Sequence, residues 1–196
     1  RVWVVGCATG EEAYSMAILF SELISELATP IRLQVFATDI DNEALTVARR
    51  GIYNETAMAE MPPDYMRRYF QASGNGFEPV KHLRDCVTFA RQDIVVDPPF
   101  LRVDLVTCRN VMIYFNAELQ TKVLSILRYA LRDDGLLFLG RSETVTQQET
   151  LFSAADRRAR IFRPRGQSKP VSLGKLVRGR LKPPGEVFQP AQKTHE

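Results

Sequence analysis

The sequence predicts an α/β fold, in which helices flank a mostly parallel sheet and a small antiparallel β-subdomain is inserted. Residues 2–5 form a β-branched apolar run, VWVV, without a polar break. Such a run is typical of a strand buried on both faces of a parallel sheet. Further apolar runs alternate with amphipathic helical segments, which favours a parallel sheet with helices on its faces. The alternation breaks between residues 51 and 90, where the insertion is expected.

The length and charge indicate one globular domain followed by a basic extension. The 196 residues, 45% of them hydrophobic, suffice for one domain with a core. From residue 163 onward there are eight Lys and Arg against two Asp and Glu, a net +6, so residues 1–162 carry −3 of the total +3. We therefore predict a domain over residues 1–162 and a linker or disordered tail over 163–196. The negative body does not suggest a nucleic-acid partner.

The three cysteines indicate a reducing environment. Cys7, Cys86 and Cys108 are odd in number and far apart, without a C-x-x-C motif or a histidine cluster. Neither a disulfide framework nor a metal site is expected, and the cytoplasm is the expected location. No apolar run approaches 18 residues and no signal-peptide pattern is present, so no direct membrane insertion is expected. Because the chain opens directly on a predicted strand, we expect a preceding segment in the parent protein.

The first predicted strand leads into a glycine turn that is followed by two acids. Gly6 and Gly10 bracket the turn, where glycine lets a ligand approach the backbone and the next helix offers free N–H groups. Glu11 and Glu12 then stand where a phosphate-binding loop would carry basic residues. Two carboxylates favour a ligand with positive charge or hydroxyl donors. S-adenosylmethionine has a sulfonium, an ammonium and a ribose, and fits this description.

The helix predicted at residues 13–27 carries a single apolar stripe. We interpret this stripe as packing against the sheet. Its members are Met16, Phe20, Leu23, Ile24 and Leu27.

The second predicted strand, residues 33–38, ends at an acid. Asp39 follows it directly, and a helix is predicted over residues 42–50. An acid at this place can accept hydrogen bonds from ribose hydroxyls. The alternative is that Asp39 begins the cap of the next helix. Because Asp41 already fills that role, we favour the ligand interpretation.

The insertion has two possible strand pairings. A helical piece is expected at residues 64–70, a turn at 73–76, and extended segments at 78–80 and 87–90. The two extended segments would form an antiparallel hairpin, whereas residues 86–90 also suit a third main strand. Asp93 follows that strand and could reach the exocyclic amine of an adenine, although loop solvation explains it equally well. The insertion is either structural or a docking element for a protein partner.

The fourth predicted strand, residues 103–108, ends in Arg109 and Asn110, which should face the ligand crevice. Tyr114 is close enough in sequence to share it. The alternative places Tyr114 and Phe115 in the core. This suits Phe115 better, because a buried phenol needs a hydrogen-bond partner.

The last third of the domain should complete the sheet. Asn116 is expected to cap a helix over residues 117–132, and Gly135 to end it in a left-handed conformation. Residues 136–139 read as the fifth strand. Phe152 and residues 160–162 are expected to form a closing antiparallel pair around a turn at 156–158.

Four motifs together resemble the C-terminal catalytic domain of CheR-type chemotaxis receptor methyltransferases. They lie at residues 6–15, 37–41, 108–115 and 134–143. The resemblance implies a Rossmann-like class I S-adenosylmethionine-dependent methyltransferase fold and a protein-glutamate O-methyltransferase whose product is S-adenosylhomocysteine. The implied cofactor residues are Gly6, Gly10, Glu11, Glu12, Asp39, Asp93, Ile94, Arg109 and Asn110.

The same resemblance implies the catalytic residues and the partners. Tyr114 would lie near the transferred methyl, with an Arg from an N-terminal helical domain, and Arg109 is the second catalytic candidate. The partner would be the cytoplasmic domain of a chemoreceptor or a related signalling protein. The insertion is similar to the family's β-subdomain, which in some members binds a receptor tail peptide. The basic tail is similar to that of large fused chemotaxis proteins, in which further domains follow.

A glutamate acceptor is already ionised at neutral pH and needs no general base. We therefore expect a site that orients its reactants. Asp39 would hold the ribose, Glu11 or Glu12 the cationic part of the methionine, and Tyr114 the methyl or the acceptor carboxylate. Arg109 could instead brace the loop by pairing with a local acid. The alternative functions are a methyltransferase of this fold with another acceptor, and a non-catalytic cofactor-binding or docking module of a larger signalling protein.

Overall fold

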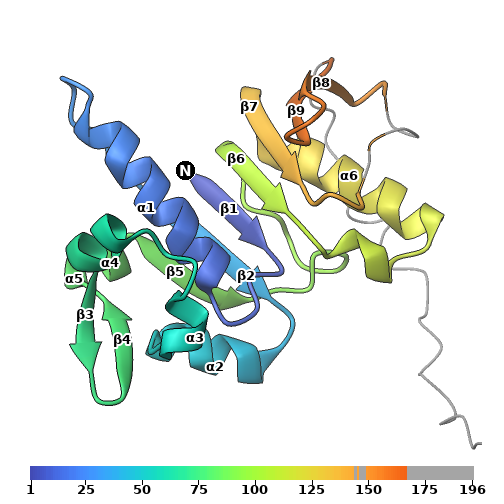
Figure 1. Ribbon diagram of the computed structural model, residues 1–196. Coiled ribbons are helices and arrows are strands. Elements are labelled where there is room, and N and C mark those ends of the chain that lie inside the picture. The colour runs from blue at the N-terminus through green and yellow to red at the C-terminus, as the bar shows by residue number, and fades with distance from the viewer. Residues whose placement is uncertain (144, 146–148, 167–196) are drawn as a thin grey trace, which may run out of the picture.

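A computed structural model describes residues 1–143, 145 and 149–166, and it contains a seven-stranded sheet in the order β5-β2-β1-β6-β7-β9-β8 (Figure 1). Strands β5, β2, β1, β6 and β7 are parallel, whereas β9 runs antiparallel to β7 and to β8. The mostly parallel sheet is therefore confirmed. The strands are β1 Val2–Val5, β2 Val35–Asp39, β5 Val87–Arg91, β6 Val103–Cys108, β7 Leu131–Leu139, β8 Phe152–Asp156 and β9 Ile161–Pro164.

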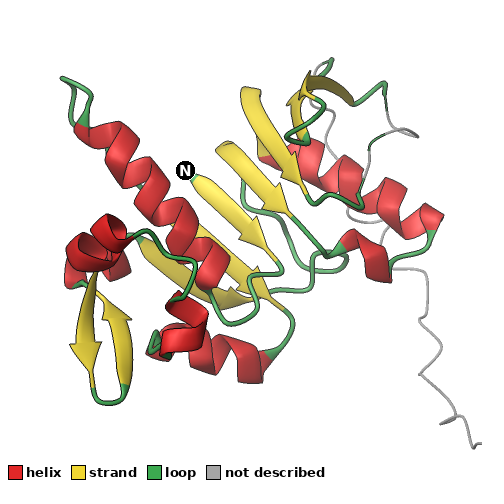
Figure 2. Ribbon diagram, in the orientation of Figure 1, coloured by secondary structure: helices red, strands yellow, loops and turns green. Residues whose placement is uncertain are grey.

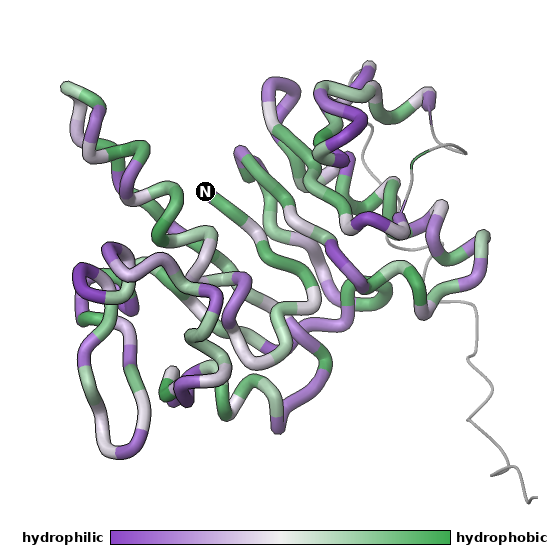
Figure 3. Tube along the Cα trace, viewed as in Figure 1, coloured by the Kyte–Doolittle hydropathy of each residue, from purple (hydrophilic) through white to green (hydrophobic). Residues whose placement is uncertain are grey.

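Helices cover both faces of this sheet (Figure 2). Alternate residues of β1 point to opposite faces, as strand geometry requires. Val2 and Val4 pack in one core cluster with α1, and Trp3 and Val5 pack in another with α6. The central strands are largely apolar along their length (Figure 3). The helices are α1 Glu11–Ser25, α2 Asn42–Arg50, α3 Glu55–Met58, α4 Pro63–Tyr69, α5 Lys81–Asp85, the 3-10 helix η1 Met112–Tyr114 and α6 Ala117–Ala130.

The apolar stripe of α1 packs only in part, so the prediction was wrong for its last turns. Leu23 is 57% exposed and Leu27, just beyond the helix, is 53% exposed. A helix of 15 residues spans about 22 Å, whereas a four-residue strand spans about 13 Å. The end of α1 therefore projects past the sheet, as Figure 1 shows.

The insertion contains an antiparallel hairpin, as predicted, and residues 87–90 form a main-sheet strand, which was the second of the two interpretations. The predicted turn joins β3 Phe70–Ser73 to β4 Gly76–Pro79, which form their own two-stranded antiparallel sheet. Residues 87–91 are β5 and pair in parallel with β2. The antiparallel pairing of residues 78–80 with 87–90 was therefore wrong, because the apolar segment at 87–90 completes the main sheet.

The predicted left-handed stop at Gly135 was also wrong. Helix α6 ends at Ala130, and Leu131 is already extended, with φ −74° and ψ 144°. Leu131 pairs with Val103 of β6, and Gly135 lies within β7. Burial of Leu131 against the neighbouring strand thus ends the helix.

Strand β9 continues past residue 162, where the tail was expected to begin. Arg163 and Pro164 belong to β9, and Arg128 Nε donates to the carbonyl of Arg165 at 3.1 Å. The rest of the predicted tail, residues 167–196, lies outside the described residues. In the part of the chain that the structure describes, no helix is long and apolar enough to cross a membrane.

Candidate functional site

A cavity of about 940 Å³ lies at the carboxyl ends of the parallel strands. Ligands of open α/β sheets bind at this edge. Seven residues predicted for the site line it, namely Gly6, Asp39, Asp93, Ile94, Arg109, Asn110 and Tyr114. Gly10, Glu11 and Glu12 do not line it and lie at the start of α1.

Both glycines of the first turn have a positive φ and leave no room for a Cβ. Gly6 has φ +66°, and a Cβ there would overlap the side chain of Val111. Gly10 has φ +96°, and a Cβ there would lie 2.9 Å from the hydroxyl of Tyr53. That hydroxyl donates to the carbonyl of Thr9 at 2.9 Å. The turn is thus held closely between α1, β6 and the start of the insertion.

We expect Gly10→Ala to lower the free energy of unfolding by about 3 kcal/mol, because it adds backbone strain to a steric clash. For a domain of this size the melting temperature should fall by roughly 5–10 °C. The matched control is Gly74→Ala, since Gly74 has φ +59° and a Cβ there would meet no atom within 4 Å. Both variants carry the strain of an alanine at positive φ, but only Gly10→Ala adds a clash, so the difference between their melting temperatures measures the clash. Equal decreases in melting temperature would show that the clash does not contribute.

Asp39 ties the glycine turn to the end of β2. Its Oδ2 accepts from the backbone N–H of Ala8 at 2.8 Å, and its Oδ1 accepts from that of Asp41 at 2.9 Å. The cap of α2 is made by Asp41, whose Oδ1 accepts from Glu43 and Ala44. Each carboxylate oxygen of Asp39 can accept a further hydrogen bond, so Asp39 can also bind a ligand hydroxyl in the cavity.

The two acids after the turn have different surroundings. Glu12 Oε2 accepts from Arg109 Nη1 at 3.0 Å, and the Arg109 guanidinium lies 4.9 Å from the centre of the Phe138 ring. Glu11 accepts instead from the hydroxyl of Thr9, at 2.7 Å and 2.9 Å. Glu12 Oε1 is buried and has no hydrogen-bond partner in the structure. Arg109 therefore braces the loop against Glu12, whose second carboxylate oxygen is buried beside the turn without a partner in the structure.

Glu143 organises the tip of β6, although no sequence pattern singled it out as a site residue. It is only 4% exposed. Its carboxylate accepts from four backbone N–H groups, those of Asn110 at 3.0 Å, Val111 at 2.8 Å, Met112 at 2.9 Å and Gly140 at 2.6 Å. The sequence signal was an acid shortly after the fifth strand, but three of its four partners lie 31 to 33 residues earlier.

Tyr114 and Phe115 lie in different surroundings, as their chemistry suggests. Tyr114 is 80% exposed at the cavity, whereas Phe115 packs against the core cluster beside α6. Asp93 both lines the cavity and accepts from the N–H of Val95 at 2.9 Å. Ile94 is buried beside it and adds an apolar wall.

The thiol of Cys7 lies within the glycine turn but is not a nucleophile. Burial, together with the negative charge of Asp39, raises its pKa to about 12. A thiol with that pKa stays protonated at neutral pH. Among the residues that the structure describes, no cluster of His, Cys, Asp or Glu could hold a metal ion.

Comparison with known proteins gives consistent matches. Residues 1–161 match the family model described as CheR methyltransferase, SAM binding domain. The chain is 41% identical to an uncharacterized 104.1 kDa protein of Rhodobacter capsulatus, over 83% of this chain and 17% of that protein. It is 39% identical to the putative methyltransferase Cher3 of Pseudomonas putida, over 83% of this chain and 62% of that protein.

A further relative is the chemotaxis protein methyltransferase of Escherichia coli. It is 36% identical over 78% of this chain and 55% of its own length. The chain thus spans less than two thirds of these relatives.

Proposed function

Because the chain belongs to the CheR methyltransferase family and contains its S-adenosylmethionine-binding domain, we propose that it methylates glutamate side chains of chemoreceptors or receptor-like signalling proteins. The main support is the cavity at the carboxyl edge of the sheet, to which Asp39, Asp93 and the tip of β6 all contribute. Relatives named chemotaxis protein methyltransferase add support for the acceptor class.

The residues at this edge fit the cofactor. Asp39 and Asp93 supply carboxylates to the cavity, and Glu12 adds a buried oxygen without a partner beside the glycine turn. Such oxygens suit ribose hydroxyls, an exocyclic amine and a cation. Asp39 would hold the ribose, Asp93 and Ile94 the adenine, and Glu12 the ammonium. Gly6 contributes to the lining of the cavity, and its lack of a side chain lets Val111 pack against the turn.

When bound, the cofactor supplies a methyl group on a positively charged sulfur, which a carboxylate can attack directly. No residue of this chain needs to act as a base, because a glutamate side chain is ionised at neutral pH. Tyr114 would orient the acceptor carboxylate at the open side of the cavity. The Arg109–Glu12 ion pair would keep the tip of β6 fixed against α1 during the reaction.

The proposal is tested by incubating the full chain with methyl-labelled cofactor and a glutamate-rich receptor signalling segment. Methyl esters of glutamate are released by mild base, so base-labile label on the segment is the expected result. Base-stable label would indicate another acceptor group. Calorimetric binding of S-adenosylhomocysteine without any transfer would instead indicate a non-catalytic module.

Within this proposal we expect Tyr114→Ala to lower kcat for methyl transfer by at least about tenfold, because misplaced reactants lose orientation. Affinity for S-adenosylhomocysteine and the melting temperature should stay unchanged, since the side chain is 80% exposed. The matched control is Ile113→Ala, the exposed neighbour that does not line the cavity. Equal kcat values for the two variants would remove Tyr114 from the mechanism.

A further inference from the structure

The β8–β9 hairpin carries a strong positive charge that the methyl-transfer proposal does not use. Five arginines and no acid occur between residues 157 and 165. They are Arg157, Arg158, Arg160, Arg163 and Arg165. In the described ranges of the chain, no carboxylate forms an ion pair with any of them. This charge is therefore not neutralised within the described domain.

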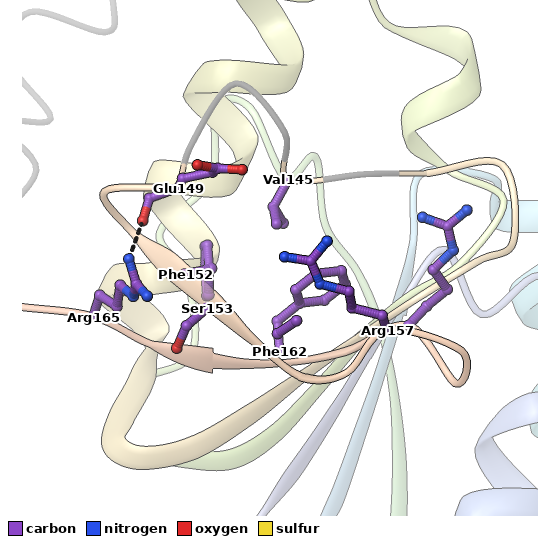
Figure 4. A pocket seen from close by; sticks show the side chains of 9 residues that line it. Val145, Glu149, Phe152, Ser153, Arg157, Phe162 and Arg165 are labelled. Atoms are coloured by element: carbon purple, nitrogen blue, oxygen red, sulfur yellow. Dashed lines mark hydrogen bonds between the residues drawn. The ribbon is translucent and has the colours of Figure 1, made fainter.

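Three of these arginines share one cavity, and two do not. Arg157, Arg160 and Arg165 line a hollow of about 260 Å³ that is distinct from the cofactor cavity, and Glu149 is the one acid among its described lining residues. Figure 4 shows Arg157 on one side and Arg165 on the other, with Phe152 and Phe162 between them. Arg165 Nη1 donates to the backbone carbonyl of Glu149 at 3.3 Å. Arg158 and Arg163 are exposed on the same hairpin but do not line the hollow.

The turn of this hairpin lies at the same edge of the sheet as the cofactor cavity. The N–H of Leu139, at the carboxyl end of β7, donates to the carbonyl of Arg160 at 3.0 Å. The next residue, Gly140, shares the carboxylate of Glu143 with Asn110 of the cofactor cavity. Strand β9 is two positions from β6 in the sheet, which corresponds to roughly 10 Å.

We propose that Arg157 and Arg160, together with Arg165 across the hollow, bind an acidic side chain of the protein acceptor about two helical turns from the glutamate that is methylated. This inference rests on the proposed function and names how its acceptor is recognised. The separation of β6 and β9, roughly 10 Å, corresponds to two turns, or about seven residues, along an acceptor helix, and this sets the spacing used in the test. Guanidinium groups bind carboxylates through paired hydrogen bonds. Exposed positive charge also increases the rate of encounter with an acidic partner.

The test is a double-mutant cycle on the full chain. The probe is a fluorescent helical peptide with one acceptor glutamate and a second glutamate about seven residues away, and its partner probe has glutamine at the second position. We expect R157Q/R160Q to raise the dissociation constant of the peptide with two glutamates about tenfold, as measured by fluorescence anisotropy. The dissociation constant of the glutamine peptide should not change, because that peptide cannot form the ion pair that the variant removes. Affinity for S-adenosylhomocysteine should not change.

The matched control is R158Q/R163Q, which removes the same charge from the same hairpin outside the hollow. Equal weakening by the two double variants, or equal loss for both peptides, would overturn the inference in favour of general charge attraction. No weakening by R157Q/R160Q would overturn it as well. If the peptide binds as expected but no label is transferred, the proposed function is wrong and the binding inference stands. If label is transferred and both double variants keep the wild-type KM for the peptide, the proposed function stands and the binding inference is wrong.

Discussion

Replacing Asp39 with Ala is expected to weaken the binding of S-adenosylhomocysteine by about 100-fold. Two hydrogen bonds from ribose hydroxyls to a carboxylate, at about 1.5 kcal/mol each, account for roughly 3 kcal/mol, which is a factor of about 100 in the dissociation constant. The variant also removes the partner of the Ala8 N–H, which positions the glycine turn. Isothermal titration calorimetry on the full chain measures the effect directly.

Asp41→Ala is the matched control for this prediction. Asp41 lies two residues away and caps α2 through its own carboxylate. Its loss should cost about 1 kcal/mol of stability without changing cofactor affinity. Asp39→Asn keeps one acceptor oxygen, which can serve the N–H of Ala8, but it loses the negative charge and the hydrogen bond from the N–H of Asp41. An affinity loss in this variant with little change in melting temperature would assign the effect to the ligand. Unchanged affinity in Asp39→Ala would exclude Asp39 from the cofactor site.

Replacing Glu143 with Ala is expected to destabilise the domain strongly. It leaves four backbone N–H groups without their acceptor, three of them at the tip of β6. The penalty for orphaned buried donors predicts a loss of about 4 kcal/mol or more. The melting temperature should fall by roughly 10 °C or more. Cofactor affinity should fall too, because Asn110 and Val111 line the cavity.

Two further variants serve as references for the loss of stability in Glu143→Ala. Glu143→Gln keeps the shape of the side chain but replaces one accepting oxygen with a donor, so about half of the loss is expected. Glu60→Ala removes an exposed acid from the insertion and should change stability by less than about 0.5 kcal/mol. Urea unfolding of the three variants gives the comparison. A loss in Glu143→Ala as small as that in Glu60→Ala would show that the four hydrogen bonds contribute little.

Local patterns in the sequence predicted most of the elements, because each depends on residues close together in the chain. The run VWVV is buried on both faces as β1, and Asp41 accepts from Glu43 and Ala44 as the predicted cap. The segment 103–108 is β6 with the same bounds. Errors arose where a distant segment competed. Leu131 extends because β6 offers a partner, and residues 87–91 join β2 instead of the insertion.

The sequence by itself determined the α/β architecture, the family, and the set of polar residues that follow the strands. Seven of its predicted site residues line one cavity, because parallel strands bring their carboxyl ends to one edge. Only the tertiary structure decided which groups pair there. It pairs Arg109 with Glu12, leaves the other oxygen of Glu12 buried without a partner, and places the buried carboxylate of Glu143 beneath the tip of β6. Such pairings join residues 31 to 97 positions apart, and their geometry depends on the register of the whole sheet, which no local pattern specifies.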